Sequence, residues 1–451
     1  MTAKRPRRVI IMGAGGRDFH NLNIFFRKNT EYKVVAFTAA QIPFISKRTY
    51  PPSLAGPLYP EGIPIFAEEL LPELIHSLLP DVVVFSYSDV SAQYVMGKAS
   101  EVMAMGPDFM LLGPHSTMLK SSFPVISVCA VRTGSGKSPL TLKLAGILKR
   151  LGHKPAVIRH PMIYGYFALQ RAQRFSGMED LDFQKCTVEE REEYEPLVGQ
   201  GVVVFAGVDY EDILSMAEKE ADVIIWDGGN NDFPFILPDL EIVVADALRP
   251  DQALGFFPGE INLRRADIVV INKAGAKERA GIKRVRDAVT LVNPGAAIIT
   301  AESPITVEGG AESLKGRKVL VVEDGPTVTH GGMAYGAGYI AAKQAGAIIV
   351  KPRNSAKGSL RDVFLKYPHL KYVLPSMGYS PEQLSDLEAT INAVPCDIVV
   401  SATPADLSRL IKTEKPIIRV RYAIQEKGQP TFNSIMKKFL QDVKPTPMPP
   451  V

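Results

Sequence analysis

The sequence predicts an α/β protein made of three successive units with mostly parallel sheets. Short, uniformly apolar runs rich in Val and Ile alternate with helical stretches along most of the chain. Such runs are typical of parallel strands that helices cover on both faces. The length of 451 residues corresponds to about three domains at ~150 residues each. With 46% hydrophobic and 22% charged residues, the chain can bury real cores, which excludes a disordered protein.

The apolar runs fix the order of the expected elements. The expected strands cover residues 9–12, 33–37, 82–85, 125–128, 223–226, 242–244, 268–271 and 318–322. Breaks in this pattern predict an N-terminal Rossmann-like domain (1–122), a P-loop nucleotide-binding domain (123–308), a C-terminal α/β domain (309–440) and a loose proline-rich tail (441–451). The P-loop domain is therefore expected between two Rossmann-like neighbours.

Charge and cysteine content exclude several classes of function. The formal net charge is only +4, and the one basic cluster, residues 4–8, precedes the first strand, so we expect no nucleic-acid partner. The three cysteines are far apart and form no CxxC pair, which argues against a disulfide framework or a zinc ribbon. No apolar stretch approaches the ~20 residues of a membrane span, and the start lacks a signal core. We expect a cytoplasmic protein without a membrane partner. A homodimer is compatible with this expectation.

The most informative segment is a phosphate loop between the strand at 125–128 and a helix expected over 140–151. Backbone amides of a glycine turn and the N-terminus of the following helix suit phosphate groups. We expect Lys137 to bridge the β- and γ-phosphates and the Ser138 hydroxyl to bind Mg²⁺. Arg132 is a candidate catalytic cation inside the loop. The nucleotide-binding candidates are Thr133, Gly134, Ser135, Gly136, Lys137 and Ser138.

This loop departs from the standard GxxxxGK[ST] pattern because Val131 occupies the position of its first glycine. The structural alternative is a Gly-Ser turn that caps an ordinary helix. The combination of strand, glycines, Lys-Ser and helix favours the phosphate loop.

Two later strands end in residues that would complete a nucleotide site. Asp227 follows a buried strand and precedes two glycines, which suits a catalytic carboxylate that organises Mg²⁺. Asn272 and Lys273 follow another buried strand and resemble the base-reading NKxD motif of GTPases. Gly275 stands where the guanine-reading Asp belongs, so ATP is at least as suitable as GTP.

Several motifs together resemble a known family. They are Arg17-Asp18-Phe19-His20-Asn21, the loop 132–138, Trp226-Asp227-Gly228-Gly229-Asn230-Asn231-Asp232 and Glu323-Asp324-Gly325-Pro326-Thr327. They are similar to predicted P-loop GTPases that are grouped with cyclic 2,3-diphosphoglycerate synthetase. The order of loop, strand-end acid and NK strand also resembles dethiobiotin synthetase and the metallochaperone GTPases.

The resemblance implies an ATP- and Mg²⁺-dependent ligase. Such an enzyme would close 2,3-bisphosphoglycerate into a ring through an internal phosphoanhydride, releasing ADP and phosphate. A small, anionic, phosphorylated substrate would require cationic side chains at the site. The rival hypothesis from a different class is a regulatory or metallochaperone-type GTPase that acts on a protein partner. A non-catalytic nucleotide sensor is a third hypothesis.

Candidate substrate ligands come from all three units: Arg17, His20, Arg159, His160 and His330. Arg159 and His160 follow a strand at the carboxyl edge, where ligands of α/β proteins bind. Three of them have a structural alternative: an ion pair for Arg159, a buried structural histidine for His20, and a glycine-rich packing turn around His330. The acid-rich segment 179–195 is expected to be a solvated helix.

Overall fold

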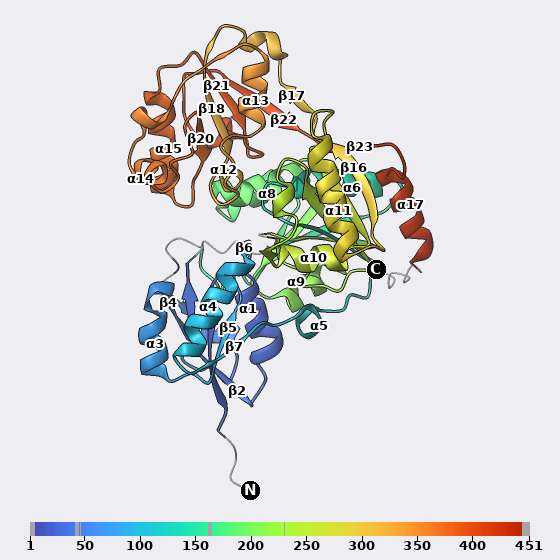
Figure 1. The fold of residues 1–451 in the computed structure, drawn as a ribbon. Helices are drawn as coiled ribbons and strands as arrows, with labels where there is room; N and C mark the ends of the chain where they lie inside the picture. Colours follow the sequence, from blue (N-terminus) through green and yellow to red (C-terminus); the bar gives the residue numbers. More distant parts are fainter. Residues whose placement is uncertain (1–4, 41–44, 46, 161–164, 230, 444–451) are drawn as a thin grey trace.

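The structure, a computed structural model, describes residues 5–40, 45, 47–160, 165–229 and 231–443. Three α/β units follow one another along the chain, with the central unit between the other two (Figure 1). Each has its own sheet, so the predicted fold class is confirmed. In the described part of the chain, no helix is long and apolar enough to cross a membrane.

The first unit is a six-stranded sheet in the order β3-β4-β2-β1-β5-β7, parallel except for β3. Its strands are β1 (Arg7–Met12), β2 (Tyr32–Ala39), β3 (Thr49–Tyr50), β4 (Ile63–Ala67), β5 (Val82–Phe85) and β7 (Asp108–Met110). Its helices are α1 (Arg17–Asn21), α2 (Pro52–Ala55), α3 (Leu71–Leu78), α4 (Ala92–Ala104) and α5 (Pro114–Thr117). The short strand β6 (Val90–Ser91) pairs with β14 (Phe256–Phe257) and joins this unit to the central one.

The central unit is a nine-stranded sheet in the order β10-β11-β9-β12-β8-β13-β15-β16-β23. Its strands are β8 (Val125–Ala130), β9 (Pro155–Arg159), β10 (Ala172–Phe175), β11 (Val203–Gly207), β12 (Val223–Asp227), β13 (Leu240–Asp246), β15 (Ile268–Asn272), β16 (Ala297–Glu302) and β23 (Gln425–Lys427). Its helices are α6 (Lys137–Arg150), α7 (Met178–Phe183), α8 (Val188–Val198), α9 (Tyr210–Ala217), α10 (Gly259–Arg265), α11 (Arg279–Val292) and α17 (Phe432–Asp442). Only the two edge strands, β10 and β23, run antiparallel to their neighbours.

The third unit is a six-stranded sheet with the strand order β17-β22-β21-β18-β19. Strand β20 also pairs with β18. Its strands are β17 (Ile305–Val307), β18 (Lys318–Asp324), β19 (Ile348–Ile349), β20 (Val373–Ser376), β21 (Ile398–Ala402) and β22 (Ile417–Tyr422). Its helices are α12 (Gly325–Val328), α13 (Ala337–Gln344), α14 (Ser359–Lys366), α15 (Pro381–Ala393) and α16 (Leu407–Leu410).

The expected strands all appear, and the central ones are buried along their full length. Apolar side chains fill both faces of the central sheet, because β8, for example, contributes Val128 to one core and Cys129 to the other. Burial on both faces explains why these runs lack polar alternation.

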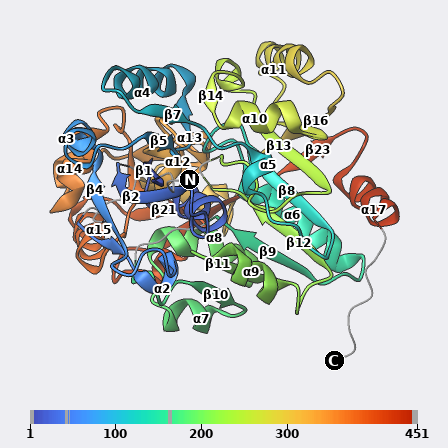
Figure 2. The ribbon, with the colours of Figure 1, turned by 90° about the horizontal axis from the view of Figure 1, so that it is seen from below.

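The observed boundary between the central and third units differs from the expected one, and the chain returns from the third unit to the central unit near its C-terminus. Strand β17 already belongs to the third sheet, before residue 309. After β22 the chain returns to the central unit, where β23 pairs with β16 and α17 packs against α6 through Phe432, Met436 and Phe439. Figure 2 shows α17 on the outside of the central unit. The expected C-terminal domain 309–440 therefore loses its last segment to the central unit, and the expected tail is helical to Asp442, with residues 444–451 outside the described ones.

Candidate active site

Strand order brings the predicted site residues to one edge of the central sheet. The adjacent strands β9, β12, β8, β13 and β15 are parallel, so their carboxyl ends lie side by side. Asp227 is in register with Arg159, and Asp246 is in register with Asn272. The phosphate loop follows β8 in the middle of this row. Residues up to 113 positions apart in sequence thus surround one loop.

The loop has the backbone that its glycines predict. Gly134 and Gly136 adopt φ of +79° and +106°, which side chains of L-residues rarely allow. At Gly136 a Cβ atom would also lie 2.1 Å from the Asn272 side-chain nitrogen. Helix α6 begins directly afterwards at Lys137, one turn earlier than expected. The N-terminus of α6 therefore points its positive dipole end at the loop.

Asp227 is fully buried and bound by two cations. Lys137 Nζ donates to Asp227 Oδ1 at 2.6 Å, and Arg159 donates to Asp227 Oδ2. Burial alone would raise the pKa of Asp227, but Arg159 and Lys137 outweigh it and hold the pKa below its ordinary value. The carboxylate is thus charged beside the Lys137 ammonium, at the position the sequence predicted for it.

Glu193 lies beside Ser138 at the start of helix α6. It is bound by the Arg159 guanidinium, and Ser138 Oγ donates to Glu193 Oε2 at 3.4 Å. Hydroxyl and carboxylate oxygens are the ligands that Mg²⁺ takes when it also binds nucleotide phosphates. Ser138 and Glu193 line the cavity, whereas Asp227 does not and has both oxygens bound by cations. The metal role of Ser138 and Asp227 therefore stays a prediction.

Asn272 and Lys273 support the loop from the side. Asn272 Nδ2 donates to the Ser135 carbonyl oxygen at 2.8 Å, and Lys273 Nζ donates to that of Gly134 at 2.7 Å. Lys273 also pairs with Asp246 at 2.9 Å. Both side chains thus bind the main chain of the loop, and contact of this pair with a base stays a prediction.

A cavity of about 700 Å³ opens above the loop and is lined by all three units. The first unit contributes the turn after β1 and the loop around Asp89, and the third unit contributes the ends of β18 and β21. Every predicted nucleotide-binding residue lines this cavity, as do Arg17, Arg159, His160 and His330. Its volume is in the range typical of small-molecule sites.

Arg132 joins the loop to the first unit. Its guanidinium lies 2.7 Å from Asp89 Oδ1 and 3.9 Å from the centre of the Phe256 ring. Both Arg132 and Asp89 line the cavity. The predicted catalytic cation is thus held between two units with its side chain largely buried.

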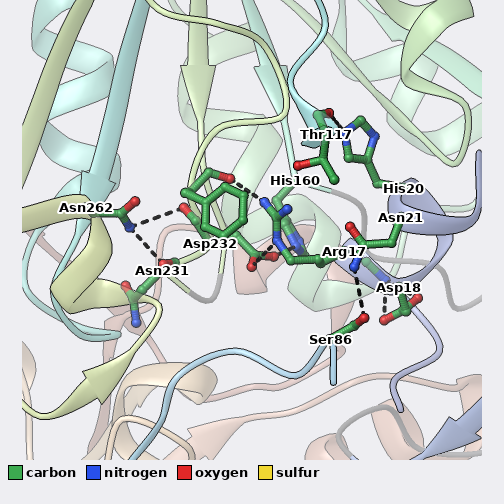
Figure 3. A network of polar contacts seen from close by, with 12 residues as sticks. Arg17, Asp18, His20, Asn21, Ser86, Thr117, His160, Asn231, Asp232 and Asn262 are labelled. Atoms are coloured by element: carbon green, nitrogen blue, oxygen red, sulfur yellow. Dashed lines mark hydrogen bonds and ion pairs between the residues drawn. The ribbon is translucent and has the colours of Figure 1, made fainter. Parts of the chain in front are cut away.

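Arg17 and His160 meet on one carboxylate, Asp232, as Figure 3 shows. Arg17 Nε donates to Asp232 Oδ1 at 2.8 Å, and His160 Nε2 lies 2.7 Å from Oδ2. The Arg17 guanidinium also stacks on Phe233 at 3.6 Å. This buried network connects α1 of the first unit to the segment after Asp227. Asn230, in the same motif, lies outside the described residues.

His20 does not line the cavity, and its contacts are those of the structural alternative, so a role as a substrate ligand stays a prediction. Its ring stacks on Phe235 at 4.0 Å, and its Nε2 atom lies 2.6 Å from the Thr117 carbonyl oxygen. Burial, with Arg17 nearby, lowers the pKa of His20 to about 3, so the imidazole is neutral.

Backbone amides of the glycine turn in the first unit bind a side-chain carboxylate from the same segment. Asp18 Oδ1 accepts hydrogen bonds from the amides of Gly15 and Phe19, both at 2.7 Å, and from that of Gly16 at 3.1 Å. A carboxylate from the chain thus occupies the place where a dinucleotide pyrophosphate binds in related turns.

The acid-rich segment is not a solvated helix. Glu189, Glu192 and Glu195 of α8 are spaced by three residues and face the third unit, and all three are buried. Glu189 accepts from the Gly378 amide at 2.9 Å and Glu195 from that of Asp406 at 2.9 Å. Helix α8 lies at the junction of the two units (Figure 1). Its acids bind backbone amides there, which the charge run alone could not indicate.

Backbone amides at the end of the glycine-rich loop after β18 bind the carboxylate of a residue in that strand. Glu323 Oε1 accepts from the amides of Gly336 at 3.0 Å and Tyr339 at 2.8 Å. His330 lines the cavity nearby, consistent with its prediction but without a described polar partner that assigns it a role.

Sequence reasoning missed Asp89, Glu192, Glu193 and Asp232. Asp89, Glu192 and Glu193 belong to no local motif that signals a site, and each of the four residues contacts a partner more than 40 residues away. Of the four, Asp232 could have been predicted from the sequence, because it lies in the Trp226–Asp232 motif that carried the resemblance.

Comparison with known proteins shows relatives of this chain. Arginine synthetase ArcE of Thermococcus kodakarensis is 55% identical over 443 residues, which cover 98% of this chain and 99% of the relative. Cyclic 2,3-diphosphoglycerate synthetase of Thermococcus sibiricus is 28% identical over 131 residues, 28% of this chain and 29% of that protein. The solved structure of LpxK from Aquifex aeolicus with ATP covers 72% of this chain and 90% of its own, at 16% identity and a TM-score of 0.39. No family model matches.

The fold and site together define a P-loop, nucleotide-dependent ligase. The chain belongs to the family of arginine synthetase ArcE. The resemblance to cyclic 2,3-diphosphoglycerate synthetase is confirmed as a more distant relationship over part of the chain. These relatives are synthetases, so the GTPase part of the resemblance is not supported.

Proposed function

We propose that this protein is an ATP- and Mg²⁺-dependent ligase that synthesises arginine. The observation that carries the proposal is the 55% identity to arginine synthetase ArcE over almost the full length of both chains. The matched region covers 98% of this chain and so spans all three units.

The chemistry follows from the product. Replacing one terminal nitrogen of the arginine guanidinium by oxygen gives the ureido group of citrulline. A ligase can transfer the ATP γ-phosphoryl group to that oxygen, breaking the bond to the β-phosphate and releasing ADP. Ammonia then attacks the ureido carbon, the C–O bond breaks, and phosphate leaves with the oxygen. Starting from an ammonium ion, the balance gives one arginine cation, ADP, phosphate and one proton.

The geometry of the phosphate loop supports phosphoryl transfer. Lys137 would neutralise charge on the β- and γ-phosphates, and Arg132 and Arg159 would do so from the cavity walls. Mg²⁺, held by Ser138 and Asp227, would supply further charge neutralisation between the phosphates. Arg159 binds the other oxygen of Asp227, so the carboxylate would stay paired if Lys137 contacted a phosphate.

The second candidate is closure of 2,3-bisphosphoglycerate, favoured by the partial match to cyclic 2,3-diphosphoglycerate synthetase. It requires cations on both sides of the substrate. That match covers only 28% of this chain, whereas the match to arginine synthetase ArcE covers 98%, which favours the first candidate.

The test is to incubate the purified protein with ATP, Mg²⁺ and either citrulline with ammonium chloride or 2,3-bisphosphoglycerate. We expect arginine and ADP to form in equal amounts from the first mixture. GTP in place of ATP measures the nucleotide preference. ADP release that depends on 2,3-bisphosphoglycerate but not on citrulline would instead establish the second candidate.

A further inference from the structure

Arg132 of the phosphate loop is immobilised by two residues from outside the loop. Its guanidinium stacks on the Phe256 ring, 3.9 Å from the ring centre, and its Nε atom lies 2.7 Å from Asp89 Oδ1. Arg132 is 8% exposed, so its charge is held mostly out of water. A long cationic side chain that is fixed in this way has already lost most of its rotational freedom before a ligand binds.

The two terminal nitrogens of this guanidinium remain available. Within the described residues, Nη1 and Nη2 of Arg132 make no hydrogen bond, and unlike Nε they are not closed off from solvent. Arg132 lines the cavity above the phosphate loop. The planar, forked donors of a guanidinium match the oxygens of a phosphate group. Arg132 can therefore bind a phosphoryl group in the cavity without giving up its contacts with Asp89 and Phe256.

A short two-stranded ribbon places both neighbours of Arg132. Asp89 directly precedes β6, and Phe256 belongs to β14, which pairs antiparallel with β6. Phe256 is in register with Ser91 of β6. The ribbon joins the first unit to the central one, so it brings a carboxylate of the first unit and an aromatic ring of the central unit to the same arginine.

Asp89 is itself held by the segment that follows Asp227. Asn231 Nδ2 donates to Asp89 Oδ1 at 2.8 Å. Asn262 Nδ2 in turn donates to the Asn231 carbonyl oxygen at 2.8 Å (Figure 3). Asp89 and Asn231 adopt φ of +58° and +57°, which residues other than glycine rarely do. Such backbone persists where surrounding contacts hold it, and it is concentrated at functional sites.

Asp89 and Arg132 depend on each other for their charges. Burial raises the pKa of Asp89 and lowers that of Arg132, and each charge opposes the shift of the other. Without the carboxylate, the guanidinium would be a largely buried cation without a countercharge. A charge that is already oriented stabilises a transition state without the cost of reorganisation. Loss of Asp89 should therefore affect phosphoryl transfer through Arg132.

We propose that Asp89 is a positioning residue for phosphoryl transfer, which orients the free nitrogens of Arg132 toward the transferred phosphoryl group. This inference rests on the proposed function, because it assigns Arg132 to the phosphoryl group that the ligase moves from ATP to its substrate. Asp89 stays the counterion of Arg132 throughout and exchanges no proton. The first unit thereby contributes to the phosphoryl-transfer site of the central unit.

The experiment compares the wild type with Asp89→Asn, which keeps the size of the side chain and removes its charge. The same substitution is made in an Arg132→Ala background. Asp209→Asn is the matched control, because Asp209 is buried, pairs with Arg27 across the same two units at 2.8 Å, and does not line the cavity. The measurements are kcat for arginine formation and calorimetric affinities for ADP and a non-hydrolysable ATP analogue with Mg²⁺.

We expect Asp89→Asn to lower kcat about tenfold or more, and to weaken binding of the ATP analogue while ADP binding stays within about twofold of the wild type. In the Arg132→Ala background, the same substitution should change kcat less than about twofold, because Asp89 acts only through Arg132. Asp209→Asn should keep the kcat of the wild type.

Three results would overturn the proposal: an unchanged kcat in Asp89→Asn, an equal loss of kcat in the Arg132→Ala background, or an equal loss in the Asp209→Asn control. Equal weakening of ADP and of the ATP analogue would also overturn it, since it indicates a general disturbance of the loop. If the wild type makes no arginine, the proposed function fails by itself. The ratio of the two nucleotide affinities in Asp89→Asn then still decides whether Asp89 acts on the γ-phosphoryl group.

Discussion

Lys137 Nζ lies 2.6 Å from Asp227 Oδ1, and Arg159 binds the other oxygen of the same carboxylate. The lysine of the phosphate loop and the arginine of strand β9 thus share one buried carboxylate. In a variant that lacks Lys137, Arg159 would keep Asp227 from becoming a buried charge without a partner.

Lys137→Ala should reduce kcat at least about hundredfold, since one preorganised charge at the transferred phosphoryl group is lost. Asp227 stays paired with Arg159, so the fold should persist. ADP release under saturating ATP is the measurement. Lys149→Ala, on the same helix but bound only to the carbonyls of Gln200 and Gly201, is the control and should retain wild-type turnover. Normal turnover in Lys137→Ala would disprove the loop assignment.

Asp227→Asn should raise the Mg²⁺ concentration needed for half-maximal activity and lower kcat, while the Kd for nucleotide changes less. The carboxylate is lost from the metal position, whereas the loop amides remain. A Mg²⁺ titration of activity and calorimetry with an ATP analogue separate the two effects. Asp246→Asn offers the comparison, since Asp246 pairs with Lys273 and Arg249 behind the loop. If it shows the larger Mg²⁺ effect, Asp227 is the wrong acid.

Asp232→Asn should lower the free energy of unfolding by about 3 kcal/mol, because it leaves the buried Arg17 without its countercharge. Guanidinium unfolding followed by the fluorescence of Trp226, the single tryptophan, measures this. Glu220→Gln breaks the exposed pair with Arg174 and should cost less than about 1 kcal/mol. Equal losses in the two variants would contradict the role of the Arg17 network.

The acids of α8 should make the protein less stable as pH rises. Burial raises the pKa of Glu189 to about 8 and that of Glu190 to about 7. Between the unfolded value of 4.5 and these folded values, the native state binds more protons than the unfolded state, so its stability falls with increasing pH. Glu189→Gln should remove part of this slope and be more stable than the wild type at pH 8, by an amount on the order of a few kcal/mol. Unfolding curves at pH 5 and pH 8 are the measurement, and an unchanged slope would contradict it.

The sequence by itself determined the fold class, the strands of the central sheet, the phosphate loop and the place of Asp227. Apolar runs covered on both faces and a glycine turn before Lys137 are local signals, and they survive in any α/β packing. The same reasoning correctly placed Arg159 and His160 at the carboxyl edge, since it requires only that parallel strands end together.

Tertiary structure alone decided which charges are paired. The contacts of Arg132 with Asp89, of Arg17 with Asp232 and of Glu192 with Thr403 join different units across 43, 215 and 211 positions of sequence. It also sent the chain after β22 back to the central sheet and buried the acids of α8. Local sequence carries no record of such distant partners, and a glutamate on a helix has the same neighbours in sequence whether water or another unit covers it.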